Sequence, residues 1–362
     1  MNIVVNASAL RSSGALSIYN QFITHLSHNV RGNNYYIFVD SKVNKPNIPG
    51  VVYLIDNNHS WLHRIIWDSN GLAKWLRKNN IVPDVVVSLQ NTGVKMNCKQ
   101  VIYYHQPLPL FDRKWNFFNR SERIMWLYSK FYSFFVKRTL TFRTEVVVQI
   151  PYIKKLFAKK FSFDPQKIHV LFPDVENIDI KHVKEEHFEN QYIHFIYPAT
   201  ATPYKEHKTL CECLNLLKSY NYDLFNKIKI HLTIKKGENI VFDKLVIKYG
   251  LSDRFVLEGR KRHSDLLSMY KASQCLLFPS VIETLGLPLL EAAAFGLPII
   301  VSDLDYAHEV LKDYKGAFYV EPYNYQLWAK MIESVCLDIK YYKPLSQQEK
   351  SSWNRFFDLI EY

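Results

Sequence analysis

Short runs of β-branched and aromatic residues recur along the chain, and each is followed by apolar positions with helical spacing. Because these runs are almost continuously apolar, they are typical of strands buried on both faces of a parallel sheet. In the first half they are 3–7, 35–39, 51–55, 84–88, 101–105, 145–149 and 168–172. In the second half they are 192–197, 228–234, 254–259, 275–280, 298–303 and 317–320.

A polar segment without a strand pattern, residues 173–191, separates the two series. The chain of 362 residues is also longer than one hydrophobic core usually grows. We therefore predict an α/β protein with two doubly wound domains, whose ligands bind beyond the carboxyl ends of the strands. The first domain is expected over 1–173 and the second over 192–345, with a linker over 174–191. A C-terminal helix over 346–362 can pack back on the first domain.

Composition excludes several classes of protein. With 48% hydrophobic and 22% charged residues, the chain is not disordered. Its five cysteines have no paired spacing, which argues against a disulfide framework or structural zinc and suits a reducing cytoplasm. The start lacks the pattern of a signal peptide. The most apolar stretch, 124–136, contains Lys130 and is too short to cross a bilayer, so we expect a soluble or peripheral protein.

The net charge of +12 is distributed unevenly. Residues 1–173 contain 23 Lys and Arg against 8 Asp and Glu, a balance of +15. Residues 174–362 have a balance of −3. We therefore expect an anionic partner to bind the first half of the chain only.

The segment "ETLGLPLLE" (283–291) has a glutamate at each end and follows a predicted strand. Pro288 favours the first helical position, where its missing N–H costs nothing. Gly296 then suits the position just after the helix. We therefore expect Glu283 in a loop and Glu291 in the first helical turn.

The backbone between the two glutamates has the features of a phosphate site. Its amides lie beside the positive end of a helix, which attracts anions. Ionised carboxylates at the two ends can accept hydrogen bonds from sugar hydroxyls. This arrangement predicts a nucleotide sugar, although each glutamate could also be an ordinary loop or helix charge. The amides belong to Thr284, Leu285, Gly286 and Leu287.

Residues 279–303 resemble the E-x7-E signature of retaining glycosyltransferases of the GT-B fold, the group-one class or family four. The two-domain layout extends this resemblance over nearly the whole chain. It implies two Rossmann-like domains with a cleft between them. It also implies that Glu291 binds the donor ribose, that Glu283 contacts the donor sugar, and that the 284–287 amides bind the diphosphate.

The same family places a basic residue on the donor diphosphate, after the first strand of the second domain. Lys205 occupies the matching position in 197–210 and can neutralise the leaving group. Lys208 is the second candidate for this basic residue, although a lysine at a helix start is equally expected to be exposed to solvent.

Many relatives also carry an arginine a few residues upstream, where this chain has Ala199 and Thr200. Lys205 therefore either acts without that partner, or another cation replaces it. Arg260 and Lys261 are the alternatives.

His105 ends a predicted strand of the first domain. A lone histidine is more often structural. By resemblance, however, His105 matches the family's interdomain histidine and is expected to bond a sugar hydroxyl or position the acceptor. It is not assigned as a general base.

Residues 6–22 have the pattern of a strand, a loop and a helix, with a single glycine, Gly14. The G-x-G-x-x-G fingerprint of dinucleotide-binding proteins is absent. The resemblance implies that the amides of Ser13, Gly14 and Ala15 contact the diphosphate and acceptor. A simple tight turn is the alternative.

Residues 113–143 contain eight Lys and Arg, one acidic residue and ten aromatic residues, and 151–161 adds four lysines. Basic residues attract anionic lipid headgroups, and aromatic residues favour the membrane interface. About half of the aromatic residues can instead belong to the core. Single-stranded nucleic acid is a further partner of such stretches, but no RNA-binding module is visible, and we expect no nucleic acid.

Together these features and the resemblance predict a retaining α-glycosyltransferase that transfers a hexose-type sugar from a nucleotide-diphosphate sugar. The acceptor is expected to be a polyprenyl-diphosphate-linked or other glycan in bacterial surface polysaccharide assembly, at the inner face of the cytoplasmic membrane. No metal or other cofactor is expected. The alternatives are a GT-B-fold sugar-nucleotide epimerase or hydrolase, and a non-catalytic membrane- or nucleic-acid-binding protein.

Overall fold

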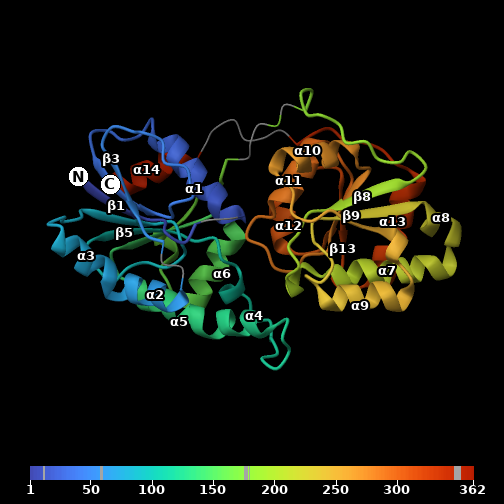
Figure 1. Ribbon diagram of the computed structural model, residues 1–362, viewed down its shortest axis with the longest axis horizontal. Helices are drawn as coiled ribbons and strands as arrows, with labels where there is room; N and C mark the ends of the chain where they lie inside the picture. The colour runs from blue at the N-terminus through green and yellow to red at the C-terminus, as the bar shows by residue number, and fades with distance from the viewer. Residues whose placement is uncertain (11–12, 58–59, 175–177, 179, 346–351) are drawn as a thin grey trace. The chain divides into compact units, whose positions relative to one another are not determined.

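The computed structural model describes residues 1–10, 13–57, 60–174, 178, 180–345 and 352–362. The chain divides into two compact units. The first unit consists of Met1–Asp174 and Glu349–Tyr362, and the second consists of Val175–Gln348. Each unit contains one parallel β-sheet packed against helices (Figure 1).

The sheet of the first unit has seven strands within the described residues, in the order β3-β2-β1-β4-β5-β6-β7. Every neighbouring pair is parallel. The order reverses direction between β1 and β4, so the topological switch point lies at their carboxyl ends. The strands are β1 (Asn2–Asn6), β2 (Asn34–Val39), β3 (Val51–Ile55), β4 (Val85–Ser88), β5 (Lys99–Tyr103), β6 (Thr144–Val148) and β7 (Ile168–Val170).

Helices cover both faces of this sheet, as the central strand β1 shows. Ile3 and Val5 belong to a core cluster with α1 and α14, whereas Val4 packs with Leu72 and Leu76 of α3 on the other face. Successive residues of a strand point to opposite faces, so a strand covered on both sides must be apolar throughout. The helices are α1 (Ser13–Leu26), α2 (Trp61–Ile66), η1 (Trp67–Gly71), α3 (Leu72–Lys78), η2 (Leu108–Leu110), α4 (Arg123–Leu127), η3 (Tyr128–Tyr132), α5 (Ser133–Thr139), α6 (Pro151–Phe161), η4 (Pro165–Lys167) and α14 (Trp353–Glu361).

The second unit repeats this plan with six parallel strands among the described residues, in the order β10-β9-β8-β11-β12-β13. Its switch point lies between β8 and β11. The strands are β8 (Ile193–Tyr197), β9 (Ile228–Leu232), β10 (Phe255–Leu257), β11 (Cys275–Phe278), β12 (Ile299–Ser302) and β13 (Ala317–Val320). The helices are η5 (Pro203–Lys205), α7 (His207–Tyr220), α8 (Tyr222–Lys227), α9 (Ile240–Tyr249), η6 (Ser252–Arg254), α10 (His263–Ala272), α11 (Leu287–Ala294), α12 (Asp305–Val310) and α13 (Tyr325–Leu337).

The predicted α/β class with two doubly wound sheets is confirmed. All thirteen predicted strands occur in the described part of the chain, and their ends differ from the predicted ends by no more than two residues. Within the segment predicted as a linker, residues 175–177 and 179 lie outside the described residues, as do 346–351 at the predicted C-terminal helix. None of the helices in the described ranges is both long and apolar enough to span a bilayer.

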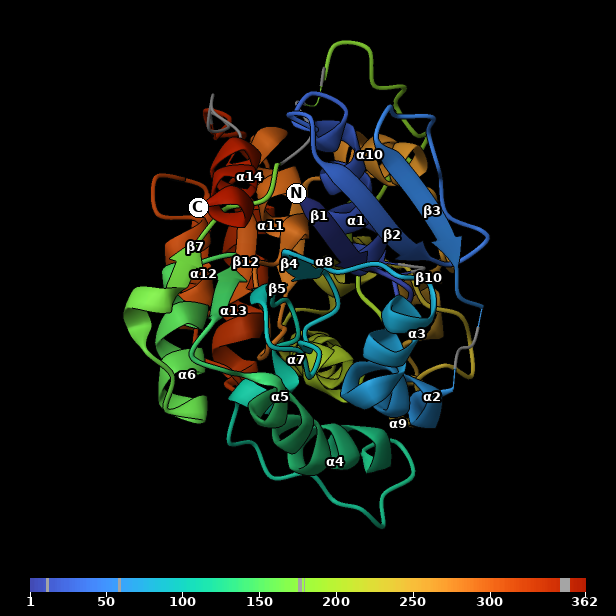
Figure 2. The same ribbon diagram turned by 90° about the vertical axis from the view of Figure 1, so that its left-hand side faces the viewer.

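The C-terminal helix α14 belongs to the first unit and lies beside α1 and β1 (Figures 1 and 2). Its apolar side chains are buried, and the ring of Phe357 stacks on Phe22 of α1 with centroids 5.5 Å apart. On its exposed side, Arg31 pairs with Asp358 at 2.8 Å and with Glu361 at 2.9 Å. The last residues of the chain therefore complete the core formed by the first residues.

We expect Phe357→Ala to destabilise the first unit by about 3–5 kcal/mol, because it leaves a cavity in a close-packed aromatic cluster. Asp358→Ala on the same helix is the matched control. It removes one half-exposed ion pair and should cost less than about 1 kcal/mol. Urea titration followed by tryptophan fluorescence measures both changes, and equal losses would contradict this account of α14.

Candidate active site

The carboxyl end of β11 leads into a loop that is held from two other segments of the second unit. Val281 N donates to Tyr204 O at 3.0 Å, and the Tyr306 hydroxyl donates to Ser280 O at 2.8 Å. The loop is largely buried, and Glu283 is only 8% exposed. These contacts fix the backbone on which the predicted donor site depends.

Helix α11 begins at Leu287, one residue before the predicted start at Pro288. Gly286 adopts φ +73°, which a glycine reaches without steric cost, and it caps the helix at this earlier position. Glu291 is therefore the fifth residue of the helix and lies in its second turn. The prediction that it lies in the first turn is wrong, because the helix starts one residue earlier than expected. Gly296, with φ +72°, follows the helix as predicted.

The backbone between the two glutamates keeps its amides available for a ligand. Among the described residues, none accepts a hydrogen bond from the N–H groups of 284–287. Two of these amides lie in the loop and the others at the amino end of α11, where the helix dipole is positive. The segment can therefore bind the oxygens of a phosphate, as the sequence predicts.

Lys205 and Glu283 form a direct ion pair between Nζ and Oε1. Both side chains are largely buried, at 15% and 11% exposure. Lys205 ends the short helix η5, and its carbonyl accepts a 2.6 Å hydrogen bond from the Tyr197 hydroxyl. Two residues 78 positions apart in the sequence are thus brought together at the end of the amide stretch. Their contact was not predicted.

Glu291 is held by two side chains of α10. His263 Nε2 lies 3.0 Å from Oε1, and the Tyr270 hydroxyl donates to Oε2 at 3.0 Å. Burial, and then the charge of Glu291, raise the pKa of Tyr270 well above its usual value, so this hydroxyl remains a donor. A carboxylate has about four lone-pair sites, so one site on each oxygen remains for a hydroxyl group of a ligand.

The other basic residues that the sequence offers for the donor diphosphate form no ion pair with Glu283 among the described contacts. Lys208 is exposed, with Nζ 5.8 Å from the ring centre of Tyr325. Lys261 pairs with Glu258 at 2.8 Å, and Arg260 is exposed. Among the described contacts, only Lys205 pairs with Glu283.

In the first unit, His105 follows β5 and is held by the loop after β4. Its backbone N–H donates to Asn91 Oδ1 at 2.6 Å. Asn91 has φ +71°, a left-handed conformation that asparagine tolerates better than most residues. Burial and, second, the positive charge of Arg64 lower the pKa of His105 to about 4. The ring is therefore neutral at pH 7, and it can donate through one nitrogen and accept through the other.

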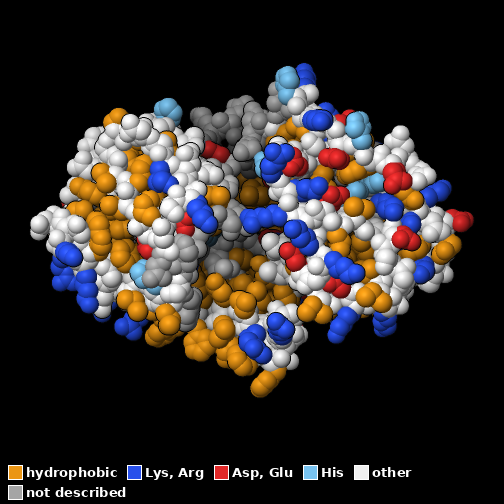
Figure 3. All heavy atoms as spheres, viewed as in Figure 1, with side chains coloured by type: hydrophobic (Ala, Val, Ile, Leu, Met, Phe, Trp, Pro, Cys, Tyr) orange, Lys and Arg blue, Asp and Glu red, His pale blue; other side chains and the backbone are white. Residues whose placement is uncertain are grey.

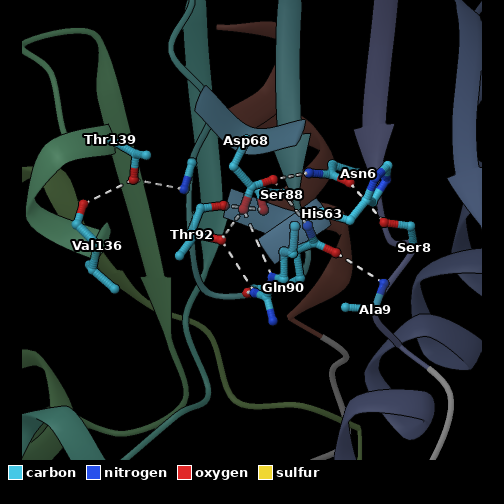
Figure 4. Close-up of polar contacts among 12 residues, drawn as sticks. Asn6, Ser8, Ala9, His63, Asp68, Ser88, Gln90, Thr92, Val136 and Thr139 are labelled. Carbon is cyan, nitrogen blue, oxygen red and sulfur yellow. Dashed lines mark hydrogen bonds and ion pairs between the residues drawn. The ribbon is translucent and has the colours of Figure 1, made fainter. Parts of the chain in front are cut away.

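A buried carboxylate, Asp68, organises the same loop (Figure 4). It accepts hydrogen bonds from Asn6 Nδ2 at 3.0 Å, Gln90 Nε2 at 3.3 Å and Thr92 Oγ1 at 2.7 Å. Gln90 in turn accepts from Ala9 N at 3.1 Å. The network thus joins the segments after β1 and β4, at the switch point of the sheet.

Arg64 completes this network from α2. Its Nη2 donates to the carbonyl of Gln90, to Thr92 Oγ1 at 3.3 Å and to the Tyr132 hydroxyl at 3.2 Å. Its Nε lies 3.8 Å from Asp68 Oδ2. The pair is largely buried at the carboxyl edge of the first sheet, and the positive charge of Arg64 acts on His105.

Gly14 lies in the first turn of α1, not in a loop, so that part of the prediction is wrong. The reason is that the helix begins at Ser13 directly after the undescribed residues 11–12. An added Cβ at Gly14 would meet nothing within 4 Å, so no close backbone approach explains the glycine. Its proposed contact with a diphosphate stays a prediction.

The structure thus places Lys205, Glu283 and the 284–287 amides at one end of the second sheet, with Glu291 on the helix that follows. His105 and Gly14 lie in the other unit. Within the described residues, no group of three or more His, Cys, Asp or Glu side chains is arranged to hold a metal ion. The metal-free reaction stays a prediction.

Sequence reasoning missed His263 and Tyr270. Their spacing of seven residues puts them on one face of α10, and this was the signal that could have identified them. It also missed Arg64 and Asp68, whose spacing of four residues is equally visible but common on helices.

Residues 178–352 match the family model described as Glycosyl transferases group 1. The chain is also similar to the O-antigen chain mannosyltransferase RfbU of Salmonella typhimurium, with 28% identity over 207 residues. This similarity covers 57% of the chain, which spans about half (55%) of the length of that relative.

Solved structures share the fold over almost the whole chain. WaaG, a glycosyltransferase involved in lipopolysaccharide biosynthesis, has a TM-score of 0.67 with 15% identity, covering 99% of both chains. Alr3699/HepE of Anabaena, solved in complex with UDP-glucose, has a TM-score of 0.62 with 14% identity, covering 93% of this chain and 90% of its own. At such identities the likeness establishes the GT-B fold alone, and it confirms the predicted fold class.

We expect His105 to titrate with a pKa of about 4, far below the 6.5 of a free imidazole, because burial and Arg64 both disfavour its charged form. NMR titration of the histidine ring signals, assigned with a His105→Gln variant, measures this value. In Arg64→Met the pKa should rise, because a nearby positive charge is lost. A wild-type value near 6.5 would show that His105 is solvated and unaffected by Arg64.

Proposed function

We propose that this protein is a retaining α-glycosyltransferase, because residues 178–352 match the family model of glycosyl transferases group 1. It moves a hexose from a nucleoside-diphosphate sugar to a glycan acceptor. The observation that carries the proposal is the buried pair of Lys205 and Glu283, which lies at the end of a stretch of available amides. The HepE structure with UDP-glucose supports this class of donor.

In the proposed complex, each part of the donor meets a matching group. The ribose hydroxyls bond the two free lone-pair sites of Glu291, and the diphosphate lies on the 284–287 amides. The hexose hydroxyls bond Glu283. The clamp formed by His263 and Tyr270 keeps Glu291 in one orientation before the donor arrives, which lowers the entropy lost on binding.

The proposed transfer breaks the bond between the anomeric carbon and the diphosphate oxygen, and that oxygen keeps the electron pair. Lys205 neutralises the charge that develops there. The acceptor oxygen bonds the anomeric carbon on the same face, and its proton passes to the departing diphosphate. His105, neutral at pH 7, positions the acceptor or a sugar hydroxyl. The front-face course follows from the resemblance to retaining enzymes.

The acceptor is proposed to be a lipid-linked glycan of a bacterial surface polysaccharide. The names of two similar proteins, an O-antigen chain mannosyltransferase and a glycosyltransferase involved in lipopolysaccharide biosynthesis, support the surface polysaccharide part of this assignment. The excess of positive charge in the first half of the chain suits the phosphates of such an acceptor.

We further propose that the first unit docks on an anionic membrane surface through α4–α6. Large apolar side chains gather on the face that α4 and α5 share (Figure 3). Of the ten aromatic residues in 113–143, five are exposed, and Trp115 and Tyr132 are buried, so the stretch serves both core and surface. Lysines of α6 add positive charge beside it. The exposed aromatic residues are Phe117, Phe118, Phe131, Phe134 and Phe142.

We expect Glu291→Ala to weaken binding of UDP, or of the donor nucleotide found in a screen, by about 100-fold or more. The variant loses two hydrogen bonds to a charged group, each contributing about 1.5–3 kcal/mol. Isothermal titration calorimetry gives the affinity, and transfer of labelled sugar gives the activity. Lys205→Ala should instead lower kcat by about 10²–10³, because its charge acts on the leaving group.

Asp313→Asn and Lys315→Ala are the matched controls, since both side chains are exposed in the same unit. Undiminished nucleotide binding by Glu291→Ala would overturn the proposed donor site. Release of free sugar without transfer to any glycan would favour a hydrolase, and a changed sugar stereocentre on the nucleotide would favour an epimerase.

Neutralising Lys154, Lys155, Lys159 and Lys160 to Gln should lower partition onto phosphatidylglycerol vesicles by at least about tenfold. Each basic residue near such a surface contributes about 1 kcal/mol. The control replaces four exposed lysines of the second unit, namely Lys236, Lys244, Lys312 and Lys315. Sedimentation with vesicles measures partition, and phosphatidylcholine vesicles show the uncharged baseline. Equal losses in both variants would exclude a specific role for α6.

A further inference from the structure

A cavity of about 30 Å³ lies in the first unit between the helices α2–η1 and η3–α5. Arg64 and Asp68 line it from the first pair, and Tyr132 and Arg138 line it from the second. Lys95, from the loop after β4, completes the wall. The cavity thus adjoins the network that holds the loop beside His105 (Figure 4).

Both helices around the cavity contain a π-helical turn. One covers Trp67–Gly71 and includes Asp68, and the other covers Tyr128–Tyr132 and ends at Tyr132. These are the two π-helical segments in the described ranges. Such turns account for well under 1% of residues in proteins and are frequent at functional sites, because the extra residue changes where side chains point. Two of them at one cavity indicate a site that is built for a ligand.

The charges around the cavity favour an anion. Arg64, Lys95 and Arg138 line it, and Asp68 is the only carboxylate in the lining. Asp68 is already satisfied by Asn6, Gln90 and Thr92. Burial raises its pKa to about 6, which weakens its charge further in mildly acidic solution.

Two of these cations have no acidic partner among the described residues. Lys95 and Arg138 are exposed, and no described residue forms an ion pair or side-chain hydrogen bond with either. Arg64 uses Nη2 and Nε within the network, and among the described residues none accepts a bond from Nη1. A phosphate oxygen is the group that several such donors bind best, and arginine binds it bidentately.

The same helices expose large apolar side chains. Leu62 and Ile66, one turn apart on α2, are 67% and 64% exposed. Phe131 and Phe134, at the junction of η3 and α5, are 47% and 58% exposed. Apolar side chains gather along this part of the surface in Figure 3. A ligand of this site would therefore meet positive charge inside and apolar surface beside it.

We propose that the mouth of the cavity between α2–η1 and η3–α5, where Lys95 and Arg138 are exposed, binds the phosphate-bearing end of an amphiphile, whose hydrocarbon chain lies on the exposed apolar side chains of these helices. If the proposed function holds, the amphiphile is the lipid-linked acceptor. Its phosphate then lies next to the loop that positions His105. A membrane lipid headgroup has the same chemistry and is the other source.

The test measures binding of farnesyl diphosphate, inorganic pyrophosphate and farnesol by calorimetry. Farnesyl diphosphate should bind at least tenfold tighter than either of the others, because only this probe has both parts. Lys95→Gln combined with Arg138→Gln should weaken its binding at least tenfold. Phe134→Ser should weaken farnesyl diphosphate without changing pyrophosphate. Lys95, Arg138 and Phe134 are all exposed, so these variants should fold.

Lys78→Gln, an exposed lysine of α3 away from the cavity, is the control and should change nothing. Equal loss in this control, unchanged binding in the double variant, or equal binding of farnesol and farnesyl diphosphate would each overturn the proposal. Binding of monomeric dihexanoyl phosphatidylglycerol, measured beside farnesyl diphosphate, separates the two sources. Binding of either compound would support the phosphate site. Tighter binding of farnesyl diphosphate identifies the lipid-linked acceptor as the natural source, and tighter binding of phosphatidylglycerol identifies a membrane lipid.

UDP binding and sugar transfer are measured on the same preparations. If Glu291→Ala loses UDP but farnesyl diphosphate does not bind the wild type, only the cavity proposal fails. If farnesyl diphosphate binds as expected and no sugar is transferred from any nucleotide donor, only the proposed function fails.

Discussion

Both sheets are parallel and covered by helices on both faces, and this constraint determines where chemistry can take place. A strand covered on both faces carries mostly apolar side chains, because a buried polar group costs free energy unless it is paired. His231 within β9 is such a paired exception, bonded to neighbouring side chains. Other polar side chains collect at the carboxyl edges. Asn6 and Ser88 end β1 and β4, and Lys205 and Glu283 lie in loops beyond β8 and β11.

The charged pairs at these edges add little to the stability of the fold. Bringing two charges out of water costs several kcal/mol per ion, and their attraction often does no more than offset this cost. Lys205–Glu283 and Arg64–Asp68 are both largely buried, and a pair of apolar residues would stabilise the fold as well. Their presence at the switch points of two separate sheets is accounted for if they act on ligands.

The fold could be predicted because its signals are local. Each strand is a short apolar run, and residues such as Gly286 and Gly296 mark the limits of α11. Glu283, Glu291 and the amides between them could be predicted for the same reason, since one loop and one helix contain them all. The helix start was wrong by one residue because the left-handed Gly286, and not Pro288, sets it.

What could not be predicted depends on contacts between distant parts of the chain. Lys205 meets Glu283 across 78 positions, and Asp68 meets Asn6 across 62. No spacing rule links such residues, because the sheet order that brings them together is not written in either segment. The predicted loop position of Gly14 was wrong for a different reason, because a glycine near a helix start fits a loop and a first helical turn equally well.

The location of unpaired charge explains why the two halves of the chain differ. In the second unit, several basic side chains have acidic partners, as in Lys205–Glu283, Lys261–Glu258 and Arg262–Asp265. If the proposed function holds, the amides must supply much of the binding of a dianionic diphosphate, because Glu283 already pairs with Lys205.

In the first unit, by contrast, Lys95 and Arg138 lie at a cavity and have no acidic partner among the described residues. Like charges that remain unpaired repel one another and weaken the compact state. The excess of +15 in residues 1–173 fits the phosphate-bearing partner proposed above, because a bound anion would reduce this repulsion. The exposed apolar side chains of α2 and α5 fit the hydrocarbon part of that proposed partner.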